Sequence, residues 1–302
     1  MEPPSVQRSL SESLDDDTIG AFLSQCSVPA LRSLNSVSRP WRERVRTALR
    51  ARVRESDHSL TIDGLSWAEL DWLLRALQRD GVRVEQLRCE QATISFAPLL
   101  AAPRVGLDDL RGCVGGGVSD VATHRRLVGA AALCVVRWGA ALARMDLHDG
   151  DDDDDDDEPW DAAFGHALGA AAVASASLAE LSVDGFALPI RQLKGTEPVA
   201  ALDLSRKRLG VASAVVISKC IEVNGVLTTI DLRYNDLGTA GWCTIFNALR
   251  DNKDNKIVSW NLSGQELDVE VVEAIAEYVA VSGALTSLNL KYNDIGDGKA
   301  AL

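Results

Sequence analysis

A short apolar pattern recurs through the last third of the chain and constrains its fold more than any other feature. The pattern is two apolar residues separated by one polar residue, and its four copies begin 28, 30 and 28 residues apart. The copies are Leu202-Asp-Leu204, Ile230-Asp-Leu232, Trp260-Asn-Leu262 and Leu288-Asn-Leu290. Each copy has one apolar residue three positions before its first residue and another seven positions after it. Self-similarity at this period predicts units that stack, because one unit cannot bury its apolar face alone.

Each unit is expected to contain one strand and one helix. The apolar-polar-apolar triplet predicts a short strand whose two apolar side chains face one way and whose polar side chain faces out. Between the strands, apolar residues recur at helical spacing, over 242–249 and again over 271–279. Gly225 and Gly283 stand where helices of this pattern should end.

A column of polar residues accompanies the triplets, five positions after the first residue of each. The column consists of Lys207, Asn235, Gln265 and Asn293. An asparagine here can hydrogen-bond backbone groups that are exposed where the strand turns. The amide of Gln265 could do the same, whereas Lys207 is not expected to. The full consensus, L-x-x-L-x-L-x-x-N-x-L, resembles the leucine-rich-repeat signature.

This resemblance carries a fold and a binding surface. One strand and one helix in about 28 residues is similar to the ribonuclease-inhibitor class of leucine-rich repeats. It implies an α/β solenoid, a horseshoe with parallel strands on its concave face and helices on its convex face. A partner would bind the concave face, where Tyr and Arg are common anchors. The partner-binding candidates are Arg206, Arg233, Tyr234, Lys291 and Tyr292. The alternative is that each is an ordinary exposed residue of its repeat.

Weaker copies of the pattern extend toward the N-terminus. Two of them are Leu178-x-x-Leu181-x-Val183 and Leu142-x-x-Met145-x-Leu147, and fainter ones centre on Leu110, Leu87 and Leu60. We therefore expect the solenoid to cover 57–302, irregular to about 198 and regular from 199. The intervals Leu87 to Leu110 and Leu181 to Leu202 are short, which predicts a shortened or missing helix in each.

An acidic loop at 149–158 interrupts the irregular part. The interval from Leu142 to Leu178 is 36 residues, and it becomes 28 when the eight residues Asp151 to Glu158 are removed. The acidic run therefore reads as an insertion, and a solvated loop is expected in preference to a cation site. The next helix has barely begun at Leu302, so we expect the sequence to be a fragment or a shortened gene model.

The segment before the repeats does not follow the repeat pattern. Residues 1–13 are polar and predict a disordered tail, and apolar residues over 14–56 are spaced as in short packed helices. This segment resembles the F-box, a small all-α adaptor-binding motif, most clearly in Val-Ser-Arg-Pro-Trp-Arg at 37–42. The resemblance implies docking on the adaptor subunit of a Skp–cullin–F-box ubiquitin ligase through Leu14, Phe22, Leu23, Leu31, Val37 and Trp41. The alternative is a helical cap that seals the first repeat.

Charge and cysteine usage narrow the class of protein. The net charge is −13, and nine of the negative charges lie at 149–158. Eight arginines and one glutamate lie between Arg32 and Arg54, without the interleaved aromatics of a nucleic-acid surface. No nucleic-acid or membrane partner is therefore expected. The six cysteines are scattered, which fits buried thiols in a reducing compartment. With no signal peptide or membrane span, the chain is expected in the cytoplasm or nucleus.

No catalytic constellation is visible. The four histidines, His58, His124, His148 and His166, have no paired nucleophile or suitably spaced acid. We expect no enzyme activity, no cofactor and no metal. The sequence predicts a protein-binding repeat protein, and the F-box resemblance implies that it is a substrate-recognition subunit of a ubiquitin ligase. The alternative is a repeat scaffold or regulator, GTPase-activator-like or sensor-like, without a ligase role.

Overall fold

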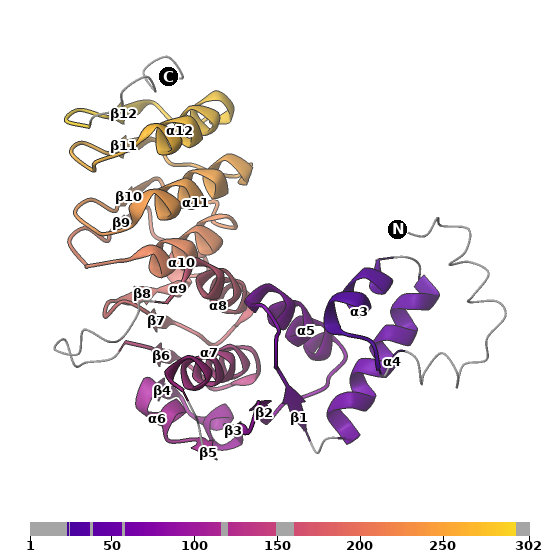
Figure 1. Ribbon diagram of the computed structural model, residues 1–302. Helices are drawn as coiled ribbons and strands as arrows, with labels where there is room; N and C mark the ends of the chain where they lie inside the picture. The colour runs from indigo at the N-terminus through magenta and orange to yellow at the C-terminus, as the bar shows by residue number, and fades with distance from the viewer. Residues whose placement is uncertain are drawn as a thin grey trace. The chain divides into compact units, whose positions relative to one another are not determined.

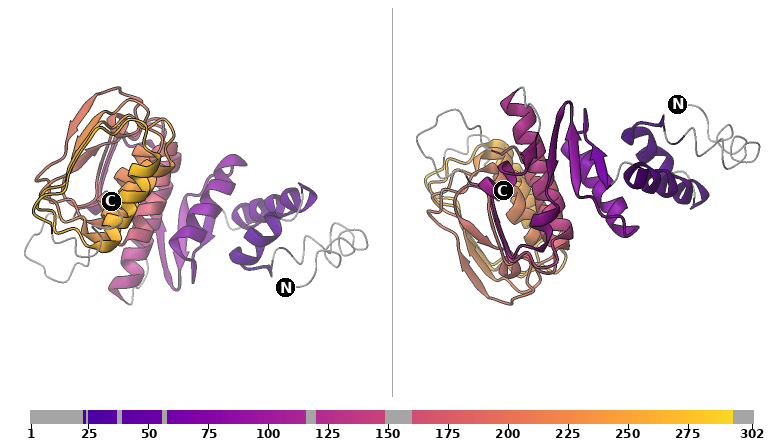
Figure 2. Two further views of the ribbon diagram at one scale, coloured as in Figure 1. Left: turned by 90° about the horizontal axis from the view of Figure 1, so that it is seen from above. Right: turned by 90° about the horizontal axis from the view of Figure 1, so that it is seen from below.

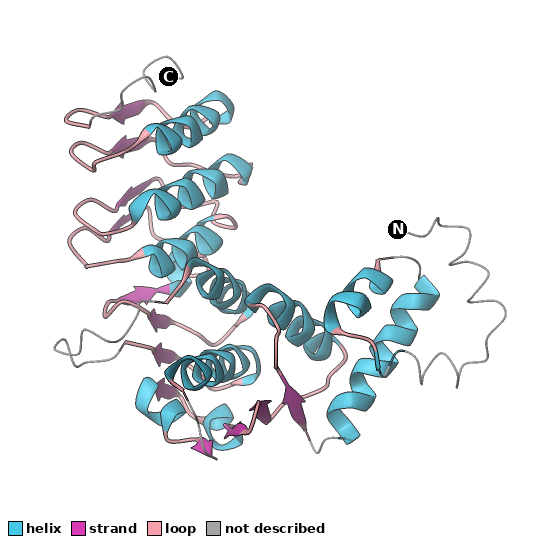
Figure 3. Ribbon diagram, viewed as in Figure 1, coloured by secondary structure: helices cyan, strands magenta, loops and turns pink. Residues whose placement is uncertain are grey.

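The structure, a computed structural model, describes residues 23, 25–36, 39–55, 58–115, 120–148 and 160–293. It is a mixed α/β protein of helices and short strands (Figure 3). The chain divides into two compact parts. The first part is Met1–Ser95 with Gly115–Ala130, and the second is Phe96–Val114 with Ala131–Leu302.

The first part joins a helical segment to one strand–helix–strand unit (Figure 1). Its elements are α3 (Val28–Asn35), α4 (Arg39–Glu55), β1 (Ser59–Thr61), α5 (Trp67–Arg79), β2 (Gln86–Cys89) and β3 (Ala92–Ser95). Helices α3 and α4 pack on each other and on α5, and α4 also contacts β1. Strand β1 pairs in parallel with β2, with Leu60 opposite Leu87. Strand β3 then pairs antiparallel with β2.

Two further elements lie where the chain crosses between the parts. They are the two-residue strand β5 (Val114–Gly115) and the long helix α7 (Val121–Trp138). The second part begins with the irregular elements η1 (Ala97–Ala101), β4 (Arg104–Gly106), α6 (Leu107–Arg111), β6 (Arg144–Asp146), α8 (Ala162–Ala174), β7 (Glu180–Ser182), β8 (Ala187–Pro189) and α9 (Ile190–Leu193). Its first sheet has the order β4-β6-β7-β8.

Regular modules follow, each made of a strand, the turn after it and a helix, except that the described residues of the last module contain only its strand and turn. We name them by their strands: the β9 module (199–226), the β10 module (227–256), the β11 module (257–284) and the β12 module (285–293). Their elements are β9 (Ala201–Asp203), α10 (Val211–Ile221), β10 (Thr229–Asp231), α11 (Gly238–Asp251), β11 (Ser259–Asn261), α12 (Val269–Val281) and β12 (Ser287–Asn289). The central residues of β9 and β10, Leu202 and Ile230, are register partners in a parallel pair, as are Trp260 and Leu288 of β11 and β12.

The helices of these modules form a second layer. Helix α10 packs on α8 and α11, and α11 packs on α12. Seen along the stack, α10 to α12 superpose on one side and the strands lie on the other (Figure 2). The buried aromatic residues Trp242, Phe246, Trp260 and Tyr278 fill the space between α11, α12 and β11. Phe246 meets Trp260 edge-on, with the ring centroids 5.2 Å apart.

The two short intervals of the sequence pattern contain short helices, as predicted. Helix α9 has only four residues, and the interval that ends at Leu110 holds the five-residue 3-10 helix η1. Helix α8 packs directly on α10, and two glycines permit the close approach. A Cβ added at Gly165 would lie 3.0 Å from Ala212 O, and one added at Gly169 would lie 3.0 Å from Lys219 Cβ.

Two details of the prediction were wrong. Leu110 does not centre a strand, because it lies in helix α6 and the strand is β4, just before it. The strands are also not all parallel, since β3 and β8 run antiparallel to β2 and β7. Each antiparallel strand follows a turn of only a few residues, too short for the crossover that a parallel strand requires.

The acidic insertion lies outside the described residues, but its two flanks are held together. Trp160 Nε1 donates a hydrogen bond to Leu147 O at 3.2 Å. The Trp160 ring stacks on Phe164, with centroids 4.2 Å apart, at the start of α8. Leu147 and Trp160, on either side of the undescribed residues 149–159, therefore lie next to each other, and β6 pairs with β7.

None of the six cysteines, all of them among the described residues, forms a disulfide. Cys89, Cys134 and Cys220 are buried, as predicted, whereas Cys26, Cys113 and Cys243 are only half-buried. Within the described ranges, no helix is both long and apolar enough to cross a bilayer. The described residues also contain no group of three or more His, Cys, Asp or Glu side chains placed to hold a metal ion.

Candidate partner-binding surface

The five residues predicted to bind a partner all lie in the turns that follow β9, β10 and β12. Tyr234 is 56% exposed and Tyr292 is 89% exposed. Arg206 and Lys291 are also exposed, and Arg233 is half-buried. These turns lie at equivalent places in their modules, at the same edge of the stack (Figure 1).

Three of these side chains stand on a strained backbone. Four residues after the strand centre, the chain is left-handed in every regular module, with φ of +57° at Arg206, +60° at Tyr234, +62° at Gly264 and +62° at Tyr292. This region disfavours residues that have a Cβ by about 1–2 kcal/mol. Gly264 builds the same turn without a side chain, so the turn itself does not need the arginine or the tyrosines.

Two arginine side chains lie close to the Tyr234 ring. The Arg206 guanidinium carbon lies 4.7 Å from the Tyr234 ring centroid, and that of Arg233 lies 5.9 Å away. The Arg233 side chain is itself held by three hydrogen bonds to Asp231, from Nε to Oδ1 at 2.9 Å and to Oδ2 at 3.2 Å, and from Nη2 to Oδ2 at 2.7 Å. These bonds keep the pKa of Asp231 below its ordinary value. Arg206 is therefore the cation of this group that is most available to a partner.

The outward-facing Asp and Asn residues of the strands accept hydrogen bonds from the backbone of the turns that follow. In five strands the last residue, Asp or Asn, accepts a hydrogen bond from the backbone N–H two residues further on, at 2.9–3.3 Å. These residues are Asp146, Asp203, Asp231, Asn261 and Asn289. Such Asx turns explain the residue type at this position without a ligand. The exposed side chains after the strands are therefore better binding candidates than the strand residues themselves.

The polar column holds neighbouring modules together where it is asparagine. Asn235 Oδ1 accepts from Lys207 N at 2.9 Å and Leu209 N at 3.2 Å, in the preceding module. Its Nδ2 donates to Leu204 O and Leu232 O, both at 2.8 Å. Asn293 makes the corresponding four bonds two junctions later, to Gln265 N, Leu267 N, Leu262 O and Leu290 O.

The other two members of the column behave differently, as their side chains predict. Gln265 is one methylene longer than asparagine, and its Oε1 accepts from Tyr234 N at 3.1 Å. Its Nε2 donates to Ser263 O and Gly264 O within its own turn. We call the hydrogen bonds that Asn235 and Asn293 make between modules the asparagine ladder. Lys207 makes no ladder bond among the described residues, and its ammonium instead lies 4.9 Å from the Phe186 ring.

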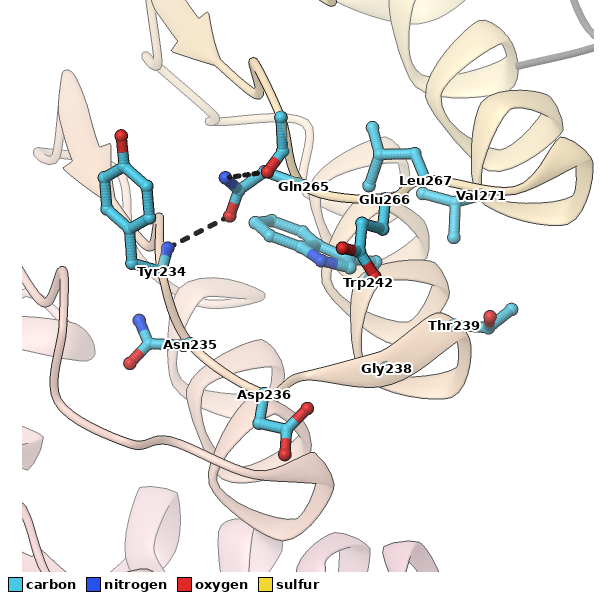
Figure 4. Close-up of a pocket in the computed structure, with 11 residues that line it drawn as sticks. Tyr234, Asn235, Asp236, Gly238, Thr239, Trp242, Gln265, Glu266, Leu267 and Val271 are labelled. Carbon is cyan, nitrogen blue, oxygen red and sulfur yellow. Dashed lines mark hydrogen bonds between the residues drawn. The ribbon is translucent and has the colours of Figure 1, made fainter. Parts of the chain in front are cut away.

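A groove opens at the junction where Gln265 replaces asparagine. It has a volume of about 360 Å³ and lies between the turn 234–239 and the turn 264–267. Figure 4 shows the Trp242 indole between the two turns, with Asp236 on one and Glu266 on the other. At the other junctions, the asparagine accepts hydrogen bonds from two backbone N–H groups of the preceding module. The equivalent groups here, Asn235 N–H and Leu237 N–H, donate to no side chain among the described residues.

The predicted adaptor-binding residues are only partly described. Leu23 and Leu31 are fully buried in the helical segment of the first part. Their side chains therefore support the packing of that segment. Leu14, Phe22 and Val37 lie outside the described residues, as does the side chain of Trp41.

Sequence reasoning found the turns but missed the groove and the left-handed backbone. The only sequence signal for the left-handed position is Gly264, which stands where the other modules have Arg206, Tyr234 and Tyr292. Comparison with known proteins adds no relative: no family model matches the chain, and no curated protein matches it significantly.

Proposed function

We propose that this chain is a leucine-rich-repeat protein of the ribonuclease-inhibitor-like class that binds a partner protein through the turns after β9, β10 and β12. The repeat assignment is supported by the 28- to 30-residue spacing and the parallel register of β9 with β10 and of β11 with β12. The inter-module bonds of Asn235 and Asn293 support it as well.

One observation carries the binding proposal. Arg206, Tyr234 and Tyr292 keep large side chains at a left-handed position where glycine would fold at lower free energy. Tyr292 is 89% exposed, so burial does not account for its side chain. Strain that is retained at an exposed position is typical of functional surfaces, and Tyr and Arg are the side chains most enriched among binding hot spots.

The experiment compares proteins captured by the tagged full chain and by a Tyr234→Gly/Tyr292→Gly variant, using quantitative mass spectrometry. Glu90→Gly is the matched control, because Glu90 is exposed and left-handed (φ +54°) but lies in the first part. We expect specific partners to be lost from the tyrosine variant and kept by the control. A captured set that is identical for all three proteins would contradict the proposal.

A more specific role is that the helical segment docks on the adaptor of a Skp–cullin–F-box ubiquitin ligase, which would make the chain a substrate-recognition subunit. The packed pair α3 and α4, with Leu31 and Val45 buried, fits a compact helical motif. The same helices contact α5 and β1, and Arg50 pairs with Asp80 at 3.3 Å between Nη2 and Oδ1. Those contacts fit equally well a cap on a scaffold or regulator without a ligase role.

Mixing the purified full chain with a Skp-type adaptor distinguishes the two roles. The ligase proposal expects a stable complex on size-exclusion chromatography, weakened by Leu14→Ala without loss of helix content. Leu31→Ala is expected to act differently, by destabilising the buried helix pair. If no complex forms with the folded chain, the ligase role fails and the scaffold role stands.

A further inference from the structure

We infer that the groove between turns 234–239 and 264–267 binds a positively charged side chain, lysine or arginine, presented by the partner protein. This inference rests on the proposed partner-binding function and adds the chemistry of one contact. The groove adjoins Tyr234, so a partner seated on the turns would reach both.

The groove lies at the junction where the asparagine ladder is interrupted by Gln265. At the junctions before and after it, Asn235 and Asn293 each bridge two turns with four hydrogen bonds. At the β10–β11 junction Gln265 turns to Tyr234 N and to its own turn. Gln265 thus makes one bond to the facing turn, Thr239 donates to Asp268 across the same junction, and a space of about 360 Å³ remains between the turns. That volume is at the lower end of small-molecule pockets, which suits a single side chain.

The lining of the groove selects the charge of its occupant. Its eleven lining residues include two carboxylates, Asp236 and Glu266, and no lysine, arginine or histidine. Trp242, Leu267 and Val271 supply an apolar wall for the aliphatic stem of a long side chain, and the Trp242 indole can attract a cation. Asp236 and Glu266 are exposed and come from opposite turns of the groove, so both carboxylates add to its negative charge.

Two features favour an anion, and both are weaker. Helix α11 begins at Gly238, and its N-terminus is equivalent to about half a positive charge. The N–H groups of Asn235 and Leu237 are further partial charges. Two full negative charges outweigh them. Arg206, the nearest strong cation to Tyr234, belongs to the β9 module, on the side of β10 away from Gln265.

Glu266 adds a second sign of selection. Its φ is +53°, so this carboxylate also stands on a left-handed backbone where glycine would be less strained. Glu266→Gly and Glu266→Gln therefore form a useful pair of variants: the first relieves the backbone and removes the side chain, and the second keeps the shape and removes only the charge.

The test titrates the full-length chain with Nα-acetyl-arginine amide and, as a neutral isostere, Nα-acetyl-citrulline amide. The readout is the NMR signals of the Trp242 indole N–H and the Gln265 side-chain amide. We expect saturable shifts with the arginine probe and a weaker response to citrulline. Glu266→Gln and Asp236→Asn should each weaken arginine binding about two- to fivefold, the range of an exposed ion pair. Equal binding of the two probes, or no saturable shift with arginine, would overturn the inference.

Partner capture separates this inference from the proposed function. If capture is lost with Tyr234→Gly/Tyr292→Gly but unchanged by Glu266→Gln and Asp236→Asn, the partner uses the turns and the groove inference is wrong. If none of these variants changes capture, the proposed function itself fails, whatever the arginine probe does.

Discussion

The asparagine ladder predicts a large and local effect of one small substitution. Asn235→Ala removes four hydrogen bonds of 2.8–3.2 Å, three of which join the β10 module to the β9 module. Each such bond contributes roughly 0.5–1.5 kcal/mol net, and the partners that are lost are backbone groups in a half-buried place. Some of these groups will find water, so we expect the free energy of unfolding to fall by about 3 kcal/mol.

The assay is urea unfolding of the full chain, followed by circular dichroism and tryptophan fluorescence. Lys207→Ala is the matched control, because Lys207 holds the same column position but makes no ladder bond among the described residues. Its loss should cost only about 0.5 kcal/mol, the value of an exposed cation–π contact with Phe186. A cost below about 1 kcal/mol for Asn235→Ala, or equal costs for the two variants, would refute the view that the column joins the modules.

Three further predictions follow from the turns. The free energy of unfolding of Tyr292→Gly should exceed that of Tyr292→Ala by about 1 kcal/mol, because only the alanine keeps a Cβ at φ +62°. Equal midpoints in urea unfolding would show that the left-handed strain is absent. Gln265→Asn should raise the melting temperature, since asparagine can accept hydrogen bonds from Asn235 N and Leu237 N and so raise the free energy of unfolding by about 1 kcal/mol. An unchanged melting temperature with an intact groove would contradict this. Asp268 caps α12 through Val271 N at 3.0 Å, so Asp268→Ala should cost about 1 kcal/mol. The Thr239 hydroxyl and the Val271 N–H lower the pKa of Asp268 below its ordinary 3.8. Its contribution is therefore present above pH 3.8 and lost as the pH falls through the folded pKa, so unfolding curves of wild type and Asp268→Asn should converge in acid.

Strand positions were the most predictable feature of the chain. Leu60, Leu87, Met145, Leu181, Leu202, Ile230, Trp260 and Leu288 all lie in strands, because an apolar-polar-apolar triplet must present one face to a core. Strand direction was not predictable in the same way. The triplet reads the same in either direction, so nothing in the residues of β3 or β8 distinguishes a hairpin return from a new parallel strand.

The candidate site was predictable in position but not in detail. The repeat pattern placed Arg206, Tyr234 and Tyr292 in equivalent turns, and the structure has them there. The left-handed φ of these residues could not be read from their types, since arginine and tyrosine have no preference for that region. The groove depends on a single methylene in Gln265 and on where its amide turns, which is a matter of packing between modules.

The most direct test of the binding proposal is a hydrogen-exchange footprint of the full chain with and without its captured partner. The proposal predicts that protection on binding will concentrate in the turns 203–208, 231–236 and 289–293. Protection confined to helices α10, α11 and α12, with the turns unchanged, would contradict it, because the partner would then bind the opposite face of the modules.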